Sequence, residues 1–148
     1  MYEKLSKRVE KIIKLASNIA REYEQDYVGT EHVLLAIERE GTGLGAQVLR
    51  AHGLNGHRLK SEVESLVKKS MEDTWVFGRL PGTPHFRNVV ATAIEQAQQL
   101  ESKEVCSEHL LLALLREKGS VACTALHNLR INYAAVREDI LRLASSST

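Results

Sequence analysis

The run Thr30-Glu31-His32-Val33-Leu34-Leu35-Ala36 decides the fold, because it returns 77 positions later as Ser107-Glu108-His109-Leu110-Leu111-Leu112-Ala113. The match continues on both sides of the two runs without a gap. Apolar residues recur at the same shift in the pairs Ile12/Val89, Ala16/Ala93, Leu49/Leu126, Val63/Ile140 and Leu66/Leu143. A shift that holds over this length indicates two copies of one structural unit.

The composition is that of an ordinary globular protein, with 43% hydrophobic and 26% charged residues among 148, which suits one domain or two halves sharing a core. Aromatic residues make up only 5%, and the other apolar residues are mostly Leu, Val, Ile and Ala, which favours helices over a β-sandwich.

Charge and hydropathy argue against nucleic acid and membranes as partners. The formal net charge is +1, and the basic residues between positions 7 and 14 are offset by Glu3 and Glu10. No apolar run approaches the roughly 20 residues that span a bilayer, and the start of the chain lacks the apolar segment of a signal peptide. We therefore expect a cytoplasmic location.

Apolar residues at three- and four-residue steps predict four helices in each copy. Ser6, Thr30 and Asn132 are expected to cap helices, and in Thr83-Pro84 a capping hydroxyl precedes a proline at the first helical position. Gly53 suits a left-handed helix end. The predicted helices span about 6–23, 30–40, 44–51, 56–69, 86–100, 108–118, 121–129 and 133–144.

These patterns predict an all-α fold of two tandem four-helix repeats with pseudo-twofold symmetry, forming a single domain over residues 1–148. Repeat one is expected over 3–70, a connector over 71–82, repeat two over 83–144 and a polar tail over 145–148. The tail has the composition of a flexible linker.

Histidine and cysteine patterns do not predict a metal site or a catalytic site. The spacing around His32 and His109 differs from HExxH, so we expect each histidine to be hydrogen-bonded locally at the start of a buried helix. Cys106 and Cys123 have no CxxC spacing and are expected to be reduced thiols. Repeat one has Gly29 where repeat two has Cys106. A thiol hydrolase built on Cys106 remains the alternative from the enzyme class.

Two tandem units with a [Thr/Ser]-Glu-His-[Val/Leu]-Leu-Leu-Ala core helix resemble the Clp N-terminal repeat domain, the amino-terminal domain of Hsp100/Clp AAA+ unfoldases. The segments 28–32 and 38–43 and the Thr83-Pro84 restart look most like the ClpC branch, and the resemblance covers about residues 3–144. It implies a domain without a cofactor that receives substrate proteins and adaptor proteins. The parent chain's ATPase ring then threads the substrates into a protease.

The resemblance also implies that phosphorylated arginine binds at two related sites. Glu31 and Glu108 would face outward, each towards the guanidinium of a ligand, as bidentate acceptors. Ser6 and Thr83 would lie at the phosphate end, beside the N–H groups of a helix N-terminus. The alternative is that both glutamates only stabilise their helix ends, by roughly 0.3–1 kcal/mol each.

Repeat two departs from the family pattern at its site. Thr30, beside Gly29 in repeat one, is expected to border the first site, and Ser107 borders the second as its replacement. Cys106 adds bulk where a glycine allows close backbone approach, which puts the second site in question.

The resemblance also implies a contact region for adaptors and small peptides, on the surface between the repeats near the first and fifth helices. Tyr2, Leu5, Trp75 and Phe77 are the candidate contact residues, since large apolar side chains are unexpected in a connector or before a first helix. The alternative for Trp75 and Phe77 is that they pack the connector onto the two repeats.

The sequence contains no GxxxxGK[ST] phosphate-binding loop, so this polypeptide is not expected to bind ATP in the P-loop manner. Two readings follow: the N-terminal domain of a longer unfoldase, or a stand-alone Clp-repeat protein acting as an adaptor or regulator of a Clp ATPase or protease.

Overall fold

Helices dominate the computed structural model, which describes residues 4–25, 27–71 and 83–146. The expected all-α fold is confirmed. The described elements are β1 (Lys4–Leu5), α1 (Lys7–Glu22), α2 (Thr30–Glu40), α3 (Leu44–Ala51), α4 (Gly56–Met71), α5 (Pro84–Gln99), β2 (Glu104–Val105), α6 (Ser107–Arg116), α7 (Val121–Asn128) and α8 (Tyr133–Ser146).

Backbone conformation repeats at the same shift as the sequence. Glu24 and Glu101 follow the first helix of each repeat, and both have a φ of 58°. Gly53 and Arg130 end the third helix of each repeat with φ values of 77° and 68°. The two halves therefore share the turns that set their helix directions as well as an apolar pattern.

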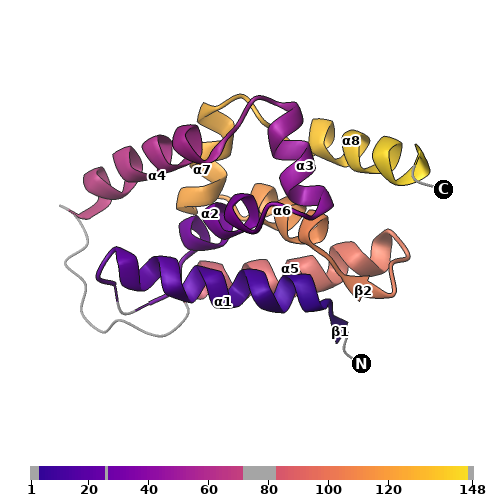
Figure 1. Cartoon of the computed structure of the whole chain (residues 1–148), viewed down its shortest axis with the longest axis horizontal. Coiled ribbons are helices and arrows are strands. Elements are labelled where there is room, and N and C mark those ends of the chain that lie inside the picture. The colour runs from indigo at the N-terminus through magenta and orange to yellow at the C-terminus, as the bar shows by residue number, and fades with distance from the viewer. Residues whose placement is uncertain (1–3, 26, 72–82, 147–148) are drawn as a thin grey trace.

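The two repeats interlock. In Figure 1, α2 and α6 lie at the centre, with α1 and α5 on one side and the remaining four helices on the other. Helix α1 packs on α2 and α5 packs on α6, whereas α3 of repeat one lies against α6 and α7 of repeat two lies against α2 and α4. Each central helix is therefore enclosed by helices from both halves.

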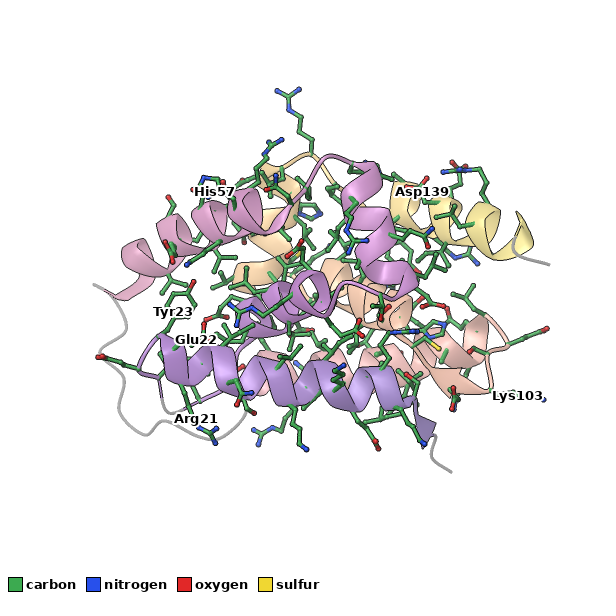
Figure 2. All side chains as sticks on the ribbon, in the orientation of Figure 1. Arg21, Glu22, Tyr23, His57, Lys103 and Asp139 are labelled. Atoms are coloured by element: carbon green, nitrogen blue, oxygen red, sulfur yellow. The ribbon has the colours of Figure 1, made fainter. Side chains whose placement is uncertain are left out.

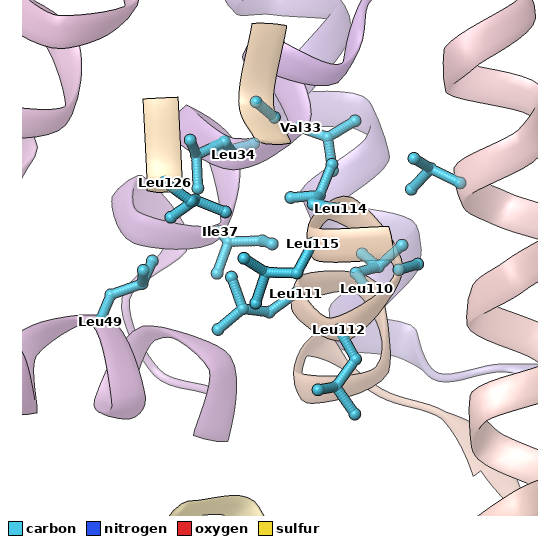
Figure 3. Close-up of a cluster of buried hydrophobic side chains, with 14 of the residues drawn as sticks. Val33, Leu34, Ile37, Leu49, Leu110, Leu111, Leu112, Leu114, Leu115 and Leu126 are labelled. Atoms are coloured by element: carbon cyan, nitrogen blue, oxygen red, sulfur yellow. The ribbon is translucent and has the colours of Figure 1, made fainter. Parts of the chain in front are cut away.

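The core is an aliphatic cluster around α2 and α6, as Figure 3 shows. Leu34, Leu111 and Leu126 are completely buried. Each fully buried leucine contributes roughly 1.5–3 kcal/mol relative to an exposed one. This burial explains why the two central helices carry apolar residues on almost every side.

A short parallel pair, β1 with β2, joins the two repeats in the register Lys4↔Glu104 and Leu5↔Val105. The sequence analysis did not predict it. Two residues per strand are too few to produce an alternating apolar pattern.

Capping residues confirm three of the four expected helix starts. Ser6 accepts a hydrogen bond from the Val9 N–H at 3.1 Å, Thr83 accepts one from the Phe86 N–H at 3.0 Å, and Asn132 accepts one from the Ala135 N–H at 2.9 Å. The fourth prediction is wrong: Gly29 is the N-cap of α2, and Thr30 is its first helical residue.

The hydroxyls of Thr30 and Ser107 instead cross between repeats. Ser107 Oγ accepts a hydrogen bond from the Gly45 N–H at 3.0 Å, and Thr30 Oγ1 accepts one from the Ala122 N–H at 3.2 Å. The two bonds are equivalent under the repeat shift. Helix α3 has Gly43 at its N-cap, with no side chain to serve its own first turn, so Ser107 supplies the missing acceptor. A Cβ on Gly45 would lie 2.9 Å from the Ser107 carbonyl oxygen, so the close approach needs glycine here.

His32 and His109 are held locally, as expected. Each accepts a hydrogen bond on Nδ1 at 2.8 Å, from the Gly29 N–H and the Cys106 N–H respectively. Both rings are buried, and burial lowers the pKa of each to about 4. Both rings are therefore neutral near pH 7, with the proton on Nε2.

The far end of α8 differs from the expected tail. The helix continues to Ser146, although serine is a weak helix former. Helix α4 likewise reaches Met71, beyond the predicted end at 69.

Replacing Ser107 with alanine should destabilise the protein by about 1–2 kcal/mol, because it leaves the buried Gly45 N–H without an acceptor. Urea denaturation followed by circular dichroism measures this. Ser65→Ala, at an exposed position of α4, is the control and should change stability by less than about 0.5 kcal/mol. Equal stability of the two variants would contradict the assigned role.

Stability should fall as the pH drops from about 6.5 towards 4, because the two buried histidines take up protons in the unfolded chain before they do in the folded one. A His32→Asn, His109→Asn variant keeps an acceptor near each Nδ1 position and should lose roughly 3–4 kcal/mol of this pH dependence, about 2 kcal/mol for each histidine between pH 7.5 and pH 5. Denaturant midpoints at pH 7.5 and pH 5 measure it. Glu31 and Glu108 titrate with the opposite sign but are common to both proteins.

The control for that experiment is His57→Asn, since His57 lies on the outer face of α4 (Figure 2) and is exposed. Its pH dependence should match that of the wild type. A double variant with an undiminished pH dependence would contradict the assignment.

Candidate functional site

The start of each central helix meets the start of a helix from the other repeat. The Thr83 N–H donates to the Val28 carbonyl oxygen at 3.1 Å, and the Ser6 N–H donates to the Val105 carbonyl oxygen at 3.0 Å. These bonds bring together the residue types that the sequence singled out. We define the Glu31 site as Glu31, Thr83, His85 and Glu117, and the Glu108 site as Ser6, Arg8, Glu40 and Glu108.

Glu31 does not face outward as expected, because its side chain is only 6% exposed. Burial raises the pKa of its carboxyl group, opposed by a hydrogen bond from its own backbone N–H and by the nearby His85. Among the described residues no other side chain hydrogen-bonds this carboxylate. Within the described part of the chain, this carboxyl group thus lies near a helix start and has no cationic side chain hydrogen-bonded to it.

Gly29 explains how Glu31 reaches this position. A Cβ at residue 29 would lie 2.5 Å from Glu31 Oε1. The glycine thus leaves room for the carboxylate to fold back over the start of α2, where the positive end of the helix dipole favours a negative charge.

Glu108 is only partly buried. Burial raises the pKa of its carboxyl group, while its own backbone N–H and the positive charge of Arg8 act against this. The expectation of an accessible carboxylate thus fits Glu108 better than Glu31.

Ser6 and Thr83 each use a hydroxyl lone pair for a helix cap, and no described residue accepts a hydrogen bond from either hydroxyl. The first N–H groups of a helix have no intrahelical acceptor. Each site therefore combines a carboxylate from one repeat with a helix start from the other.

Two basic residues of these sites were not predicted. Arg8 Nε donates to Thr42 Oγ1 at 3.0 Å and lies 3.6 Å from Glu40. His85 occupies the equivalent place in repeat two, with Nδ1 2.6 Å from Glu117. The pairs match under the repeat shift. In the sequence, however, Arg8 is one of several basic residues offset by nearby glutamates, and His85 differs from it in residue type.

Thr30 and Ser107 lie behind these sites. Both are only 2% exposed, and their hydroxyls accept the cross-repeat hydrogen bonds described above.

The expected contact surface is described only in part. Leu5 lies in β1 and packs partly buried against the core. Tyr2, Trp75 and Phe77 lie outside the described residues, so their role as partner contacts stays a prediction.

Cys106, Glu108 and His109 place candidate ligand atoms within 4.8 Å of one another, the one such group among the described residues. The His109 ring has a single lone pair, and Nδ1 already uses it to accept the Cys106 N–H. A metal bound there would have to break this helix-start bond. Burial, followed by the charges of Glu108 and Glu104, raises the pKa of the Cys106 thiol, which disfavours a reactive thiolate.

A pocket of about 240 Å³ lies beside the Glu31 site. The pocket lies between the end of α1, the start of α2, and α4. Tyr23, labelled in Figure 2, lines it and donates a hydrogen bond to Glu64 at 2.9 Å. Its accessible walls are apolar, so it does not expose the Glu31 carboxylate. The pocket residues are Tyr23, Gln25, Glu31, His32, Val63, Glu64 and Val67.

Comparison with known sequences matches both halves of the chain to one family. The family of the Clp repeat (R) N-terminal domain matches twice, over residues 4–79 and 81–147. The chain is 36% identical over 147 residues to the chloroplast ClpA homolog CD4B of Solanum lycopersicum, an ATP-binding subunit of the Clp protease. It is 33% identical over 147 residues to ClpC/MecB of Bacillus subtilis, a negative regulator of genetic competence.

These alignments cover 99% of this chain in both cases, but only 16% and 18% of the two relatives. The chain therefore spans less than a fifth of the length of these relatives.

Solved structures share the fold. The N-terminal domain of ClpD from Arabidopsis thaliana superimposes with a TM-score of 0.77 at 17% identity, covering 96% of this chain and 95% of that one. The N-terminal domain of Hsp104 from Candida albicans gives a TM-score of 0.70 at 16% identity, with coverage of 97% and 93%. Together with the matching family and the sequence relatives, this establishes that the chain belongs to the Clp repeat N-terminal domain family, with ClpC- and ClpA-type proteins among its relatives.

Proposed function

We propose that this chain is the substrate- and adaptor-docking domain of a ClpC-like ATP-dependent unfoldase, and that it recognises phosphorylated arginine on its client proteins. Family membership supports the first part, since the relatives include ATP-binding subunits of the Clp protease. The two sites at the interface between repeats support the second. In this proposal the chain acts by binding, and ATP hydrolysis and proteolysis belong to the rest of the machine.

The observation that supports this ligand is that each site places a carboxyl group and a basic side chain on opposite sides of the interface between repeats. Each site has a glutamate near the start of a central helix and a basic residue near the start of a helix from the other repeat. Phosphoarginine has the complementary arrangement, a guanidinium bonded to a phosphoryl group. A carboxylate accepts two guanidinium N–H groups, while the helix start and the basic residue bind phosphate.

The raised pKa values of Glu31 and Glu108 add a consequence. A guanidinium binds the ionised carboxylate, so binding lowers the pKa of the glutamate and releases a proton from the fraction that was protonated. Affinity should therefore weaken as the pH falls through the raised pKa values.

Partners and location follow from the proposed machine. Substrate proteins and adaptors would dock on this domain, and the ATPase ring and protease would be reached through the parent chain. Within the described residues, no helix is both long and apolar enough to cross a bilayer. The cytoplasmic location stays a prediction, and one relative named above is a chloroplast protein.

Isothermal titration calorimetry with free phosphoarginine tests the ligand. The wild type should bind, and a Glu31→Ala, Glu108→Ala variant should lose binding by at least about tenfold, because it removes both guanidinium acceptors. Unmodified arginine should bind more weakly than phosphoarginine because it lacks the phosphoryl group.

The matched control is Glu95→Ala, Glu138→Ala, which removes two glutamates from exposed helix positions and the same net charge. It should bind like the wild type. Wild-type affinity in the Glu31→Ala, Glu108→Ala variant would contradict the site assignment. An equal loss of affinity in the control would show that the loss comes from the change in net charge.

A further inference from the structure

We infer that the two sites are unequal, and that the Glu108 site is the tighter and more phosphate-selective of the pair because of Arg8. This inference rests on the proposed recognition of phosphoarginine. It reverses the sequence expectation, in which Cys106 placed the second site in question. Three differences between the equivalent positions support it.

The first difference is the basic residue. Arg8 has five guanidinium N–H donors. Among the described residues only Nε is engaged, with Thr42 and Glu40. Its positive charge also reaches Glu108, where it opposes the burial that raises the pKa of the carboxyl group. His85 has two ring nitrogens, and Nδ1 already contacts Glu117 at 2.6 Å. Arginine can therefore offer a fork of N–H groups to a phosphate where histidine has at most one left.

The second difference is the helix start that faces the ligand. Helix α1 begins with Lys7 and Arg8, and both backbone N–H groups are without an intrahelical acceptor. Helix α5 begins with Pro84, which has no N–H, so only the His85 N–H remains before the capped third residue. The start of α1 therefore offers an anion one more backbone donor.

The third difference is access to the carboxylate. The position of Glu31 requires a glycine at residue 29, since a Cβ there would come within 2.5 Å of Oε1. Repeat two has Cys106 instead, so Glu108 does not have that space and its side chain is less buried. A guanidinium reaches Glu108 with less rearrangement than Glu31.

The number of carboxylates does not explain the difference. Each basic residue has two acidic neighbours from the elements packed around it: Glu40 and Glu108 for Arg8, and Glu117 and Glu31 for His85. The sites differ in how many N–H groups of the basic residue are left for an anion after those that contact these carboxylates are counted.

Exchanging the two basic residues tests the inference. Two-dimensional ¹H–¹⁵N NMR of the full chain during titration with phosphoarginine reports the sites separately, through the backbone amides of residues 106–108 and 29–31. In the wild type the Glu108 site should saturate first. Arg8→His should weaken that site by about tenfold or more, and His85→Arg should tighten the Glu31 site.

Arg21→His is the matched control, because Arg21 is an exposed residue of the same helix whose described partner is Asn18. It should leave both sites unchanged. His85→Arg keeps the test sharp if Arg8→His also weakens the fold, since a gain in affinity does not follow from unfolding.

Equal affinities of the two sites in the wild type, or an Arg8→His variant whose Glu108 site binds as before, would overturn the inference while leaving the proposed function in place. An absence of phosphoarginine binding at both sites would overturn the proposed recognition, and the ranking with it.

Discussion

The structure depends on satisfying the polar starts of two helices that lie in the middle of an aliphatic core. A helix begins with N–H groups that have no partner within the helix, and leaving them unpaired away from water is costly. At α2 and α6 a histidine from the first turn accepts the N-cap N–H, which requires a neutral ring. Burial in the core keeps both rings neutral, and the neutral rings in turn accept the N-cap N–H groups that the core would otherwise leave unpaired.

Sequence reasoning predicted the fold well because its evidence was spread over the whole chain. The repeated apolar positions predicted the helices and their number in each half, and capping residues such as Ser6 and Thr83 predicted where helices begin. It failed where the deciding contact joins distant residues. Threonine is a common N-cap residue, yet the Thr30 hydroxyl accepts a hydrogen bond from the Ala122 N–H. No local sequence pattern indicates this distant partner.

The candidate site shows the same division. Glu31 and Glu108 stood out because they repeat, but a repeat in sequence does not set exposure. The difference between Gly29 and Cys106 was visible in the sequence, but its effect on the neighbouring carboxylates depends on distances that only coordinates supply. The basic residues were missed because Arg8 and His85 differ in chemistry, although both lie second in their helices.

Among the hydrogen bonds that join the two halves in the described part of the chain, four form two equivalent pairs. The first pair is Ser6 with Val105 and Thr83 with Val28, and the second is Ser107 with Gly45 and Thr30 with Ala122. Such reciprocity is the rule of an isologous interface, in which a patch binds its own copy around a twofold axis. A protein with only one such unit would find these partners in a second molecule. The tandem chain thus has the geometry of a homodimer fused into one polypeptide. Fusion frees each half to change alone, and the exchange of glycine for cysteine at one entrance is such a change.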